Sequence, residues 1–152
     1  MQQIRFNYAD RKLTINPKCY MKEAVHNVFA NEKKSYNKIN FVFCSDKFLL
    51  QINKDFLQHD FYTDIVTFPL SIDGQPIEAE IYISLDSVKQ NAKNFSEPYE
   101  LELVRVLVHG ALHLCGYKDK SNAEKKLMRE TESQYVNHYK KFHVKQSKSK
   151  RT

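Results

Sequence analysis

The sequence lacks the features of membrane, secreted and disulfide-stapled proteins. No apolar run is long enough to cross a bilayer, and Met1–Tyr8 is followed by charge rather than by the apolar stretch of a secretion signal. The three cysteines, Cys19, Cys44 and Cys115, are odd in number and widely scattered. They indicate free thiols in a reducing compartment rather than a disulfide framework. We therefore expect a soluble, cytoplasmic protein without a membrane partner.

Internal repeats and linkers are absent as well. A length of 152 residues favours one domain, which can bury a sufficient core without covalent staples. The last residues differ in composition, because 144–152 place Lys145, Lys148, Lys150 and Arg151 among serines. We predict a single domain over residues 1–143 and a basic, disordered tail over 144–152.

Positive charge is in excess over the whole chain. The formal net charge is +6 and the sequence pI is about 9.1. This balance favours a polyanionic partner, most commonly nucleic acid. Many small proteins are basic without such a partner, so charge alone leaves both interpretations open.

The apolar pattern predicts an α+β domain. Alternating or β-branched runs predict strands, and apolar residues at helical spacing predict helices. The predicted strands are 4–8, 39–44, 65–68 and 77–84, and the predicted helices are 16–31, 46–56, 84–95, 98–115 and 121–142. A clean βαβ alternation is missing. We therefore expect a small mixed sheet of about four strands covered by helices, with the helix that begins at Pro98 buried in the centre.

That central helix carries two histidines, His109 and His113, four residues apart. The spacing places both imidazoles on one helix face, one turn apart. Gly116 is expected to end the helix, since glycine enters the left-handed conformation without steric cost. The turn that follows can bring Asp119 back to the two rings. Two imidazoles and one carboxylate leave a fourth position open, which is typical of a catalytic zinc site.

A lone His-x-x-x-His pair also occurs by chance, so the neighbouring residues must show whether the pair binds a metal. Gly110 beside the first histidine permits the close approach of another element or of a substrate, and Asp119 offers a hard anionic ligand. Cys115 is expected to point away from the histidine face. A zinc protease of the H-E-x-x-H type carries its general base where this chain has Gly110, which argues against a peptidase.

Three segments together resemble the YbeY family of bacterial endoribonucleases that mature ribosomal RNA. The run His109–Tyr117 is similar to the family's histidine signature, Asp60–Pro69 to its T-D-V-L-S-F-P strand, and Ala79–Ser84 to its G-D-I-x-I-S strand. Their order and spacing agree with the family, and the similarity extends from about Ile4 to Tyr139.

The resemblance implies an endoribonuclease that binds one Zn²⁺ per chain and prefers single-stranded RNA. It implies action on ribosomal RNA of the small ribosomal subunit, in 16S 3′-end maturation and in ribosome quality control. It also implies that His109, His113 and the residue at position 119 bind the metal and are catalytic. The family usually has a third histidine there, whereas this chain has Asp119. A carboxylate can replace it at a zinc distance of about 2.0–2.2 Å.

A second departure concerns substrate contacts. Leu57 stands where the family's N-x-x-[YF]-R segment has arginine, so another cation is expected to contact phosphate. Lys54 and His59 are candidates, although such a residue on its own is more often just a solvated side chain. We also expect substrate contacts from Tyr62, which can stack on an unpaired base, and from Thr63.

Two other functions remain open from the sequence. The protein can be a non-catalytic RNA-binding ribosome assembly factor with a structural zinc, or a metallohydrolase of another class such as a peptidase. In the favoured interpretation, the metal activates water and polarises a phosphoryl oxygen. The sequence does not distinguish attack by water from attack by the RNA 2′-hydroxyl.

Overall fold

The computed structural model describes residues 2–15, 18–57 and 63–144. Its centre is one four-stranded sheet with the order β1-β2-β4-β3. The strands are β1 (Gln3–Tyr8), β2 (Tyr36–Cys44), β3 (Ile65–Pro69) and β4 (Ile77–Ser84). β1, β2 and β4 run parallel, and β3 pairs antiparallel with β4 as a hairpin. The predicted small mixed sheet is confirmed.

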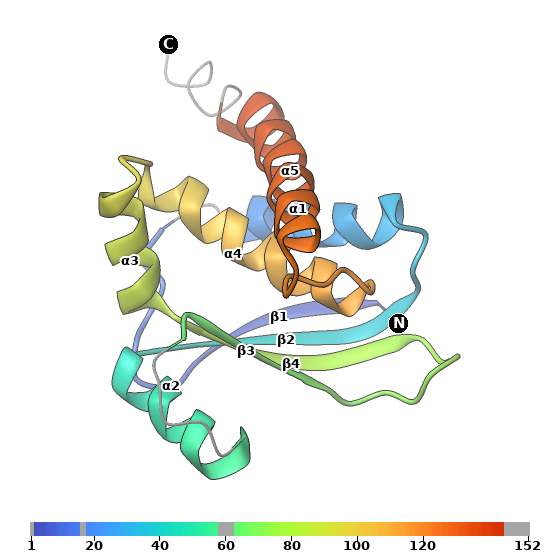
Figure 1. Cartoon of the computed structure of the whole chain (residues 1–152), viewed down its shortest axis with the longest axis horizontal. Coiled ribbons are helices and arrows are strands. Elements are labelled where there is room, and N and C mark those ends of the chain that lie inside the picture. Colours follow the sequence, from blue (N-terminus) through green and yellow to red (C-terminus); the bar gives the residue numbers. More distant parts are fainter. Residues whose placement is uncertain (1, 16–17, 58–62, 145–152) are drawn as a thin grey trace.

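Helices cover both faces of this sheet. They are α1 (Lys18–Asn31), α2 (Asp46–Ile52), α3 (Leu85–Asn94), α4 (Tyr99–Leu114) and α5 (Asn122–Tyr139), with single π-helical turns η1 (Asn53–Leu57) and η2 (Lys140–Val144). Figure 1 shows α1, α4 and α5 on one face and the short α2 on the opposite face. This arrangement confirms the predicted α+β class.

The main core lies between the sheet and α4. Ten residues of α4 are buried, among them Leu103, Leu107 and Leu112, because apolar residues surround almost the whole helix. Gly110 is where α4 comes closest to the sheet. A Cβ atom there would lie 3.1 Å from Ile65 Cδ1 and 3.3 Å from Ile81 Cδ1. The close approach that Gly110 permits is therefore with β3 and β4.

The structure corrects three details of the predicted elements. β1, α1 and β2 form a parallel βαβ unit, although we expected no clean alternation. β2 begins at Tyr36 rather than at Ile39, because Tyr36 is buried and pairs with Ile77 despite its polar neighbours. The helix predicted over 46–56 ends as α2 at Ile52 and continues as the π-turn η1.

Some predictions fall outside the described residues. These are the helix start at residues 16–17, the site residues His59 and Tyr62, and the tail from residue 145 onward. Among the described helices, none combines the length and the apolar character needed to cross a membrane.

Candidate metal centre

The last turn of α4 brings the two histidines and the following loop together. His109 and His113 lie on the same side of α4, with ring centroids 4.5 Å apart. Gly116 has φ +106°, as expected for the residue after a helix. The Tyr117 N–H donates to the Leu112 carbonyl at 3.0 Å, and the Gly116 N–H donates to the His113 carbonyl at 3.1 Å. This Schellman motif turns the chain back toward the histidine face.

Asp119 then lies beside both rings. The two Nε2 atoms of His109 and His113 are 3.0 Å apart. The Asp119 Oδ2 atom lies 3.5 Å from His109 Nε2 and 3.4 Å from His113 Nε2. Within the described part of the chain, these three residues form the one His/Cys/Asp/Glu group whose ligand atoms converge closely enough to hold a metal ion. Cys115 is not part of it.

These separations fit a tetrahedral zinc ion. Zinc binds imidazole nitrogen at about 2.0–2.1 Å and carboxylate oxygen at about 2.0–2.2 Å, so tetrahedral ligand atoms lie about 3.3–3.5 Å from one another. Two of the three observed separations fall in this range, and the third is a few tenths of an ångström shorter. The three residues can therefore hold a zinc ion with its fourth position directed away from them.

Glu132 of α5 orients one of the rings. Its Oε2 atom lies 2.5 Å from His109 Nδ1, and only 9% of the Glu132 side chain is exposed. Arg105 Nη1 lies 3.6 Å from Glu132 Oε1 and donates to Ser133 Oγ at 3.2 Å. A carboxylate on Nδ1 keeps the proton on that nitrogen and leaves the Nε2 lone pair free for a metal, as in carboxylate–histidine–zinc arrangements.

The electrostatics of His109 agree with a site for positive charge. Burial alone would lower the pKa of His109, but the hydrogen bond and charge of Glu132, with Asp119 and Asp64, outweigh it and raise the pKa above its ordinary value. These carboxylates stabilise positive charge at the imidazole. They would likewise stabilise a cation held by its Nε2 atom.

The site lies where two arms of a cleft meet. The hairpin arm, of about 1270 Å³, lies between the β3–β4 hairpin and the end of α4 and includes Lys33, Lys34 and Lys120. The α5 arm, of about 560 Å³, includes Phe95, Arg105, Lys125 and Arg129. Asp64, His109 and Asp119 line both arms. An extended ligand can therefore reach the candidate metal site from either side.

The predicted substrate-binding residues do not all lie in the cleft. Thr63 lines the hairpin arm, and its hydroxyl donates to the Ile65 carbonyl at 3.3 Å. Leu57 lines the same arm, so an apolar side chain occupies that wall. Lys54 is exposed on η1 and is not among the described residues that line either arm. Substrate contacts by His59 and Tyr62 stay predictions.

Sequence reasoning missed Glu132, Arg105 and Asp64. A signal for Glu132 was present, because it falls between Met128 and Val136 at a spacing of four on the buried face of α5. A carboxylate on an apolar helix stripe indicates a specific partner. Asp64 also had a signal, because it stands at the aspartate of the segment that resembles the family's T-D-V-L-S-F-P strand. Arg105 had no comparable signal.

Together, the fold and the site define an α+β protein with an open, three-ligand candidate metal centre at the junction of two cleft arms. The family model described as endoribonuclease YbeY matches residues 4–140. The chain belongs to the endoribonuclease YbeY family.

Named relatives support this membership. Endoribonuclease YbeY of Flavobacterium psychrophilum is 48% identical over 81% of this chain and 85% of the relative. That of Flavobacterium johnsoniae is 40% identical over 94% of this chain and 99% of the relative. The solution structure of TM1509 from Thermotoga maritima is also similar, with a TM-score of 0.62 and 28% identity, over 91% of this chain and 89% of that one.

Proposed function

We propose that the protein is a zinc-dependent endoribonuclease that cleaves single-stranded RNA in the cytoplasm. The observation that carries the proposal is the set of three ligand atoms from His109, His113 and Asp119 at the junction of two cleft arms. Three protein ligands leave a fourth position for solvent or substrate, which is characteristic of catalytic zinc sites. When bound there, one zinc ion per chain supplies Lewis acidity and acidified water.

The side chains of the protein would contribute orientation and charge. Glu132 fixes the His109 ring, so that its Nε2 atom faces the cleft. Asp64 faces the same junction from the start of β3. Lysines of the hairpin arm, Lys33, Lys34 and Lys120, offset phosphate charge without reading bases.

We propose ribosomal RNA of the small ribosomal subunit as the physiological substrate. The support is the similarity of the three motifs to the family and the basic net charge of +6. The specific roles would be 16S 3′-end maturation and ribosome quality control. A precursor 16S 3′ fragment tests this substrate, because we expect cleavage within its 3′ extension. Cleavage spread evenly over the fragment would contradict that role.

The activity itself is tested with zinc-loaded protein and a labelled single-stranded RNA. We expect cleavage by the wild type and by Lys47→Ala, a change on α2 across the sheet, and none by His113→Ala. Binding without cleavage by the wild type would favour the alternative, a non-catalytic RNA-binding assembly factor with a structural zinc. Digestion of casein but not of RNA would indicate a peptidase instead.

A further inference from the structure

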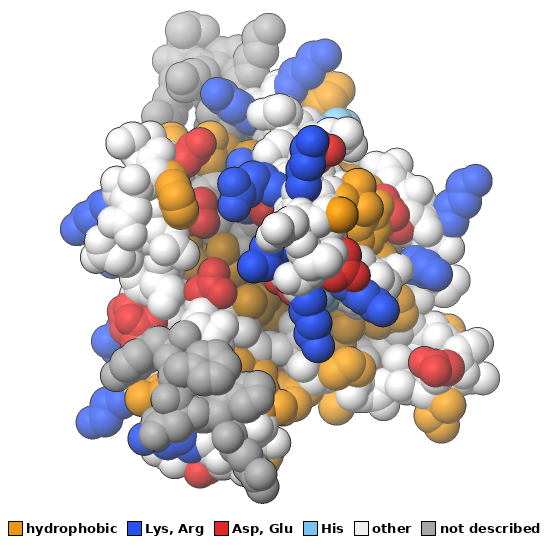
Figure 2. Space-filling model, viewed as in Figure 1, with side chains coloured by type: hydrophobic (Ala, Val, Ile, Leu, Met, Phe, Trp, Pro, Cys, Tyr) orange, Lys and Arg blue, Asp and Glu red, His pale blue; other side chains and the backbone are white. Residues whose placement is uncertain are grey.

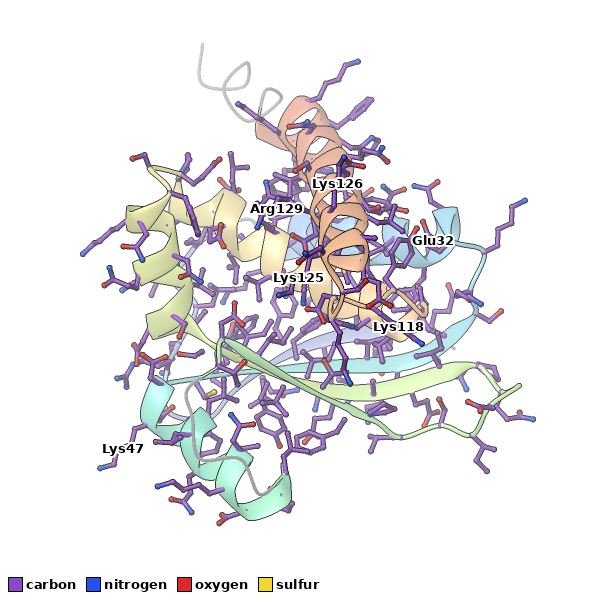
Figure 3. All side chains as sticks on the ribbon, viewed as in Figure 1. Glu32, Lys47, Lys118, Lys125, Lys126 and Arg129 are labelled. Atoms are coloured by element: carbon purple, nitrogen blue, oxygen red, sulfur yellow. The ribbon has the colours of Figure 1, made fainter. Side chains whose placement is uncertain are left out.

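The α5 arm has two exposed cations on one side. Lys125 and Arg129 are exposed, lie four residues apart on α5 and line this arm. That spacing places them one helical turn apart on the same face, with Cβ atoms about 5–6 Å apart. Figure 3 shows both on the side of α5 that faces α3 and α4, and Figure 2 shows basic side chains gathered over this part of α5. Among the described residues, neither Lys125 nor Arg129 takes part in an ion pair.

An exposed aromatic ring lines the same arm. Phe95 is 68% exposed and follows the end of α3. The backbone fixes its position, because the next residue, Ser96, has φ +53°. The Ser96 N–H donates to the Lys93 carbonyl at 3.2 Å, and the Glu97 N–H donates to the Ala92 carbonyl at 2.9 Å. A large apolar ring held at the edge of a cleft is suited to stacking rather than to core packing.

The carboxylates of the arm do not cancel its exposed cations. Glu132 is buried and held by His109 and Arg105. Glu102 is also buried, and burial raises its pKa. Asp64 and Asp119 lie at the junction with the metal site. Glu97 is the exposed carboxylate that remains on the α3 side, against two cations on the α5 side.

Cations together with an aromatic ring are the usual means of binding unpaired nucleic acid. The cations contact the backbone, and the ring stacks on a base of any identity. A volume of about 560 Å³ lies in the range of pockets that hold a small-molecule-sized group such as one nucleotide. Because His109 and Asp119 line this arm, a nucleotide in it would lie next to the phosphate at the metal site.

We infer that the α5 arm is a binding subsite for one unpaired nucleotide of the RNA next to the scissile phosphate. Phe95 stacks on the base, and Lys125 and Arg129 contact the phosphates. The inference rests on the proposed nuclease function and deepens it, since it gives a physical reason for a preference for single strands. A base within a duplex is already stacked on its neighbouring bases, so it cannot also stack on the Phe95 ring.

The charge part of this subsite is tested with the full-length, zinc-loaded double variant Lys125→Ala/Arg129→Ala. Binding of a fluorescent single-stranded RNA is followed by anisotropy before cleavage products accumulate, at a series of salt concentrations. Loss of two phosphate contacts should reduce the slope of log K against log[salt] by about 1.4, at about 0.7 per contact. The charge-matched control Lys47→Ala/Lys140→Ala removes two exposed lysines away from the arm and should leave the slope unchanged.

The stacking part is tested with Phe95→Ala. We expect the Kd for single-stranded RNA to rise about 5- to 150-fold, which corresponds to the loss of one base–aromatic stack, with no change in the salt slope. Binding of duplex RNA should not change. The matched control is Phe56→Ala, because Phe56 is 67% exposed and is not among the described residues that line either arm.

The outcomes separate this inference from the proposed function. If the wild type does not cleave RNA at all, the proposed function fails. If the wild type cleaves RNA but Phe95→Ala has the Kd of the Phe56→Ala control, the assignment of the α5 arm is overturned. The same conclusion follows if the double charge variant keeps the salt slope of its control, which would leave the two cations free for an acidic protein partner.

Discussion

Two of the side-chain clusters in the described part of the chain differ in the partners of their acceptor atoms. In the first, at the carboxyl ends of β1, β2 and β4, the carboxylates of Asp10, Asp46 and Asp86 all receive donors. Ser45 donates to Asp10 at 2.5 Å, Ser84 and Ser87 donate to Asp46 at 2.5 Å, and Arg11 donates to Asp86 at 3.0 Å.

In the second cluster, the acceptor atoms of His109, His113 and Asp119 converge on one another. Within the described part of the chain, their side-chain hydrogen bonds and ion pairs are with each other and, for His109, with Glu132. The difference separates a structural network from a candidate metal site. Carboxylates that already receive donors stabilise the fold, whereas imidazole nitrogens and a carboxylate that converge on one point could hold a cation.

The largest effect on metal content and RNA cleavage is expected from substitutions in the second cluster. His113→Ala or Asp119→Ala should lose the bound metal and lower RNA cleavage by about 10³-fold or more, because metal-ion stabilisation of the transition state amounts to several kcal/mol. Metal content by elemental analysis and initial cleavage rates check this. Asp46→Asn, from the first cluster, should retain metal and activity. Full metal content in Asp119→Ala would remove Asp119 from the ligand set.

A smaller effect is expected from the residue that orients His109. Glu132→Gln should weaken zinc affinity by about 10- to 100-fold, the usual effect of losing an outer hydrogen-bond partner of a metal ligand. Competition with a zinc chelator measures the affinity. Glu130→Gln, an exposed change on the same helix, is the control. Equal affinities in the two variants would mean that Glu132 has only a structural role.

The first cluster should affect stability rather than chemistry. Asp46→Ala leaves the buried hydroxyl of Ser84 without its acceptor, so the free energy of unfolding should fall by about 1–3 kcal/mol. Urea unfolding measures this as a lower midpoint with an unchanged m-value. A midpoint equal to that of the wild type would show that the network contributes no net stability.

The smallest expected effect is the acid dependence of Asp86. Burial alone would raise its pKa, but the Asp46 backbone N–H and Arg11 outweigh it and hold the pKa below its ordinary value of 3.8. The stabilisation is therefore present above the ordinary pKa and is lost as the pH falls through the lower, folded-state pKa. Asp86→Asn should flatten the fall in unfolding free energy below about pH 4. An acid profile identical to that of the wild type would contradict this account.

Local sequence patterns were enough to predict the α+β class and the convergence of His109, His113 and Asp119 at the candidate metal site. These predictions depend only on residues close together in the chain. His109 and His113 lie one helical turn apart, and the Schellman turn at Gly116 brings Asp119 back toward them. The parallel pairing of β1 with β2 and the contact of Glu132 with His109 depend on segments far apart in the chain. Periodicity does not encode such pairings. The exposure of Phe95 could not be predicted from the sequence either, because it depends on where α3 ends.

X-ray absorption at the zinc edge tests most directly whether His109, His113 and Asp119 hold the metal. With one equivalent of zinc on the full-length protein, we expect nitrogen and oxygen neighbours alone, at about 2.0–2.2 Å, including the outer-shell pattern of two imidazoles. A sulfur neighbour at about 2.3 Å would indicate Cys115 or another thiol as a ligand and would contradict the account, as would zinc that does not bind.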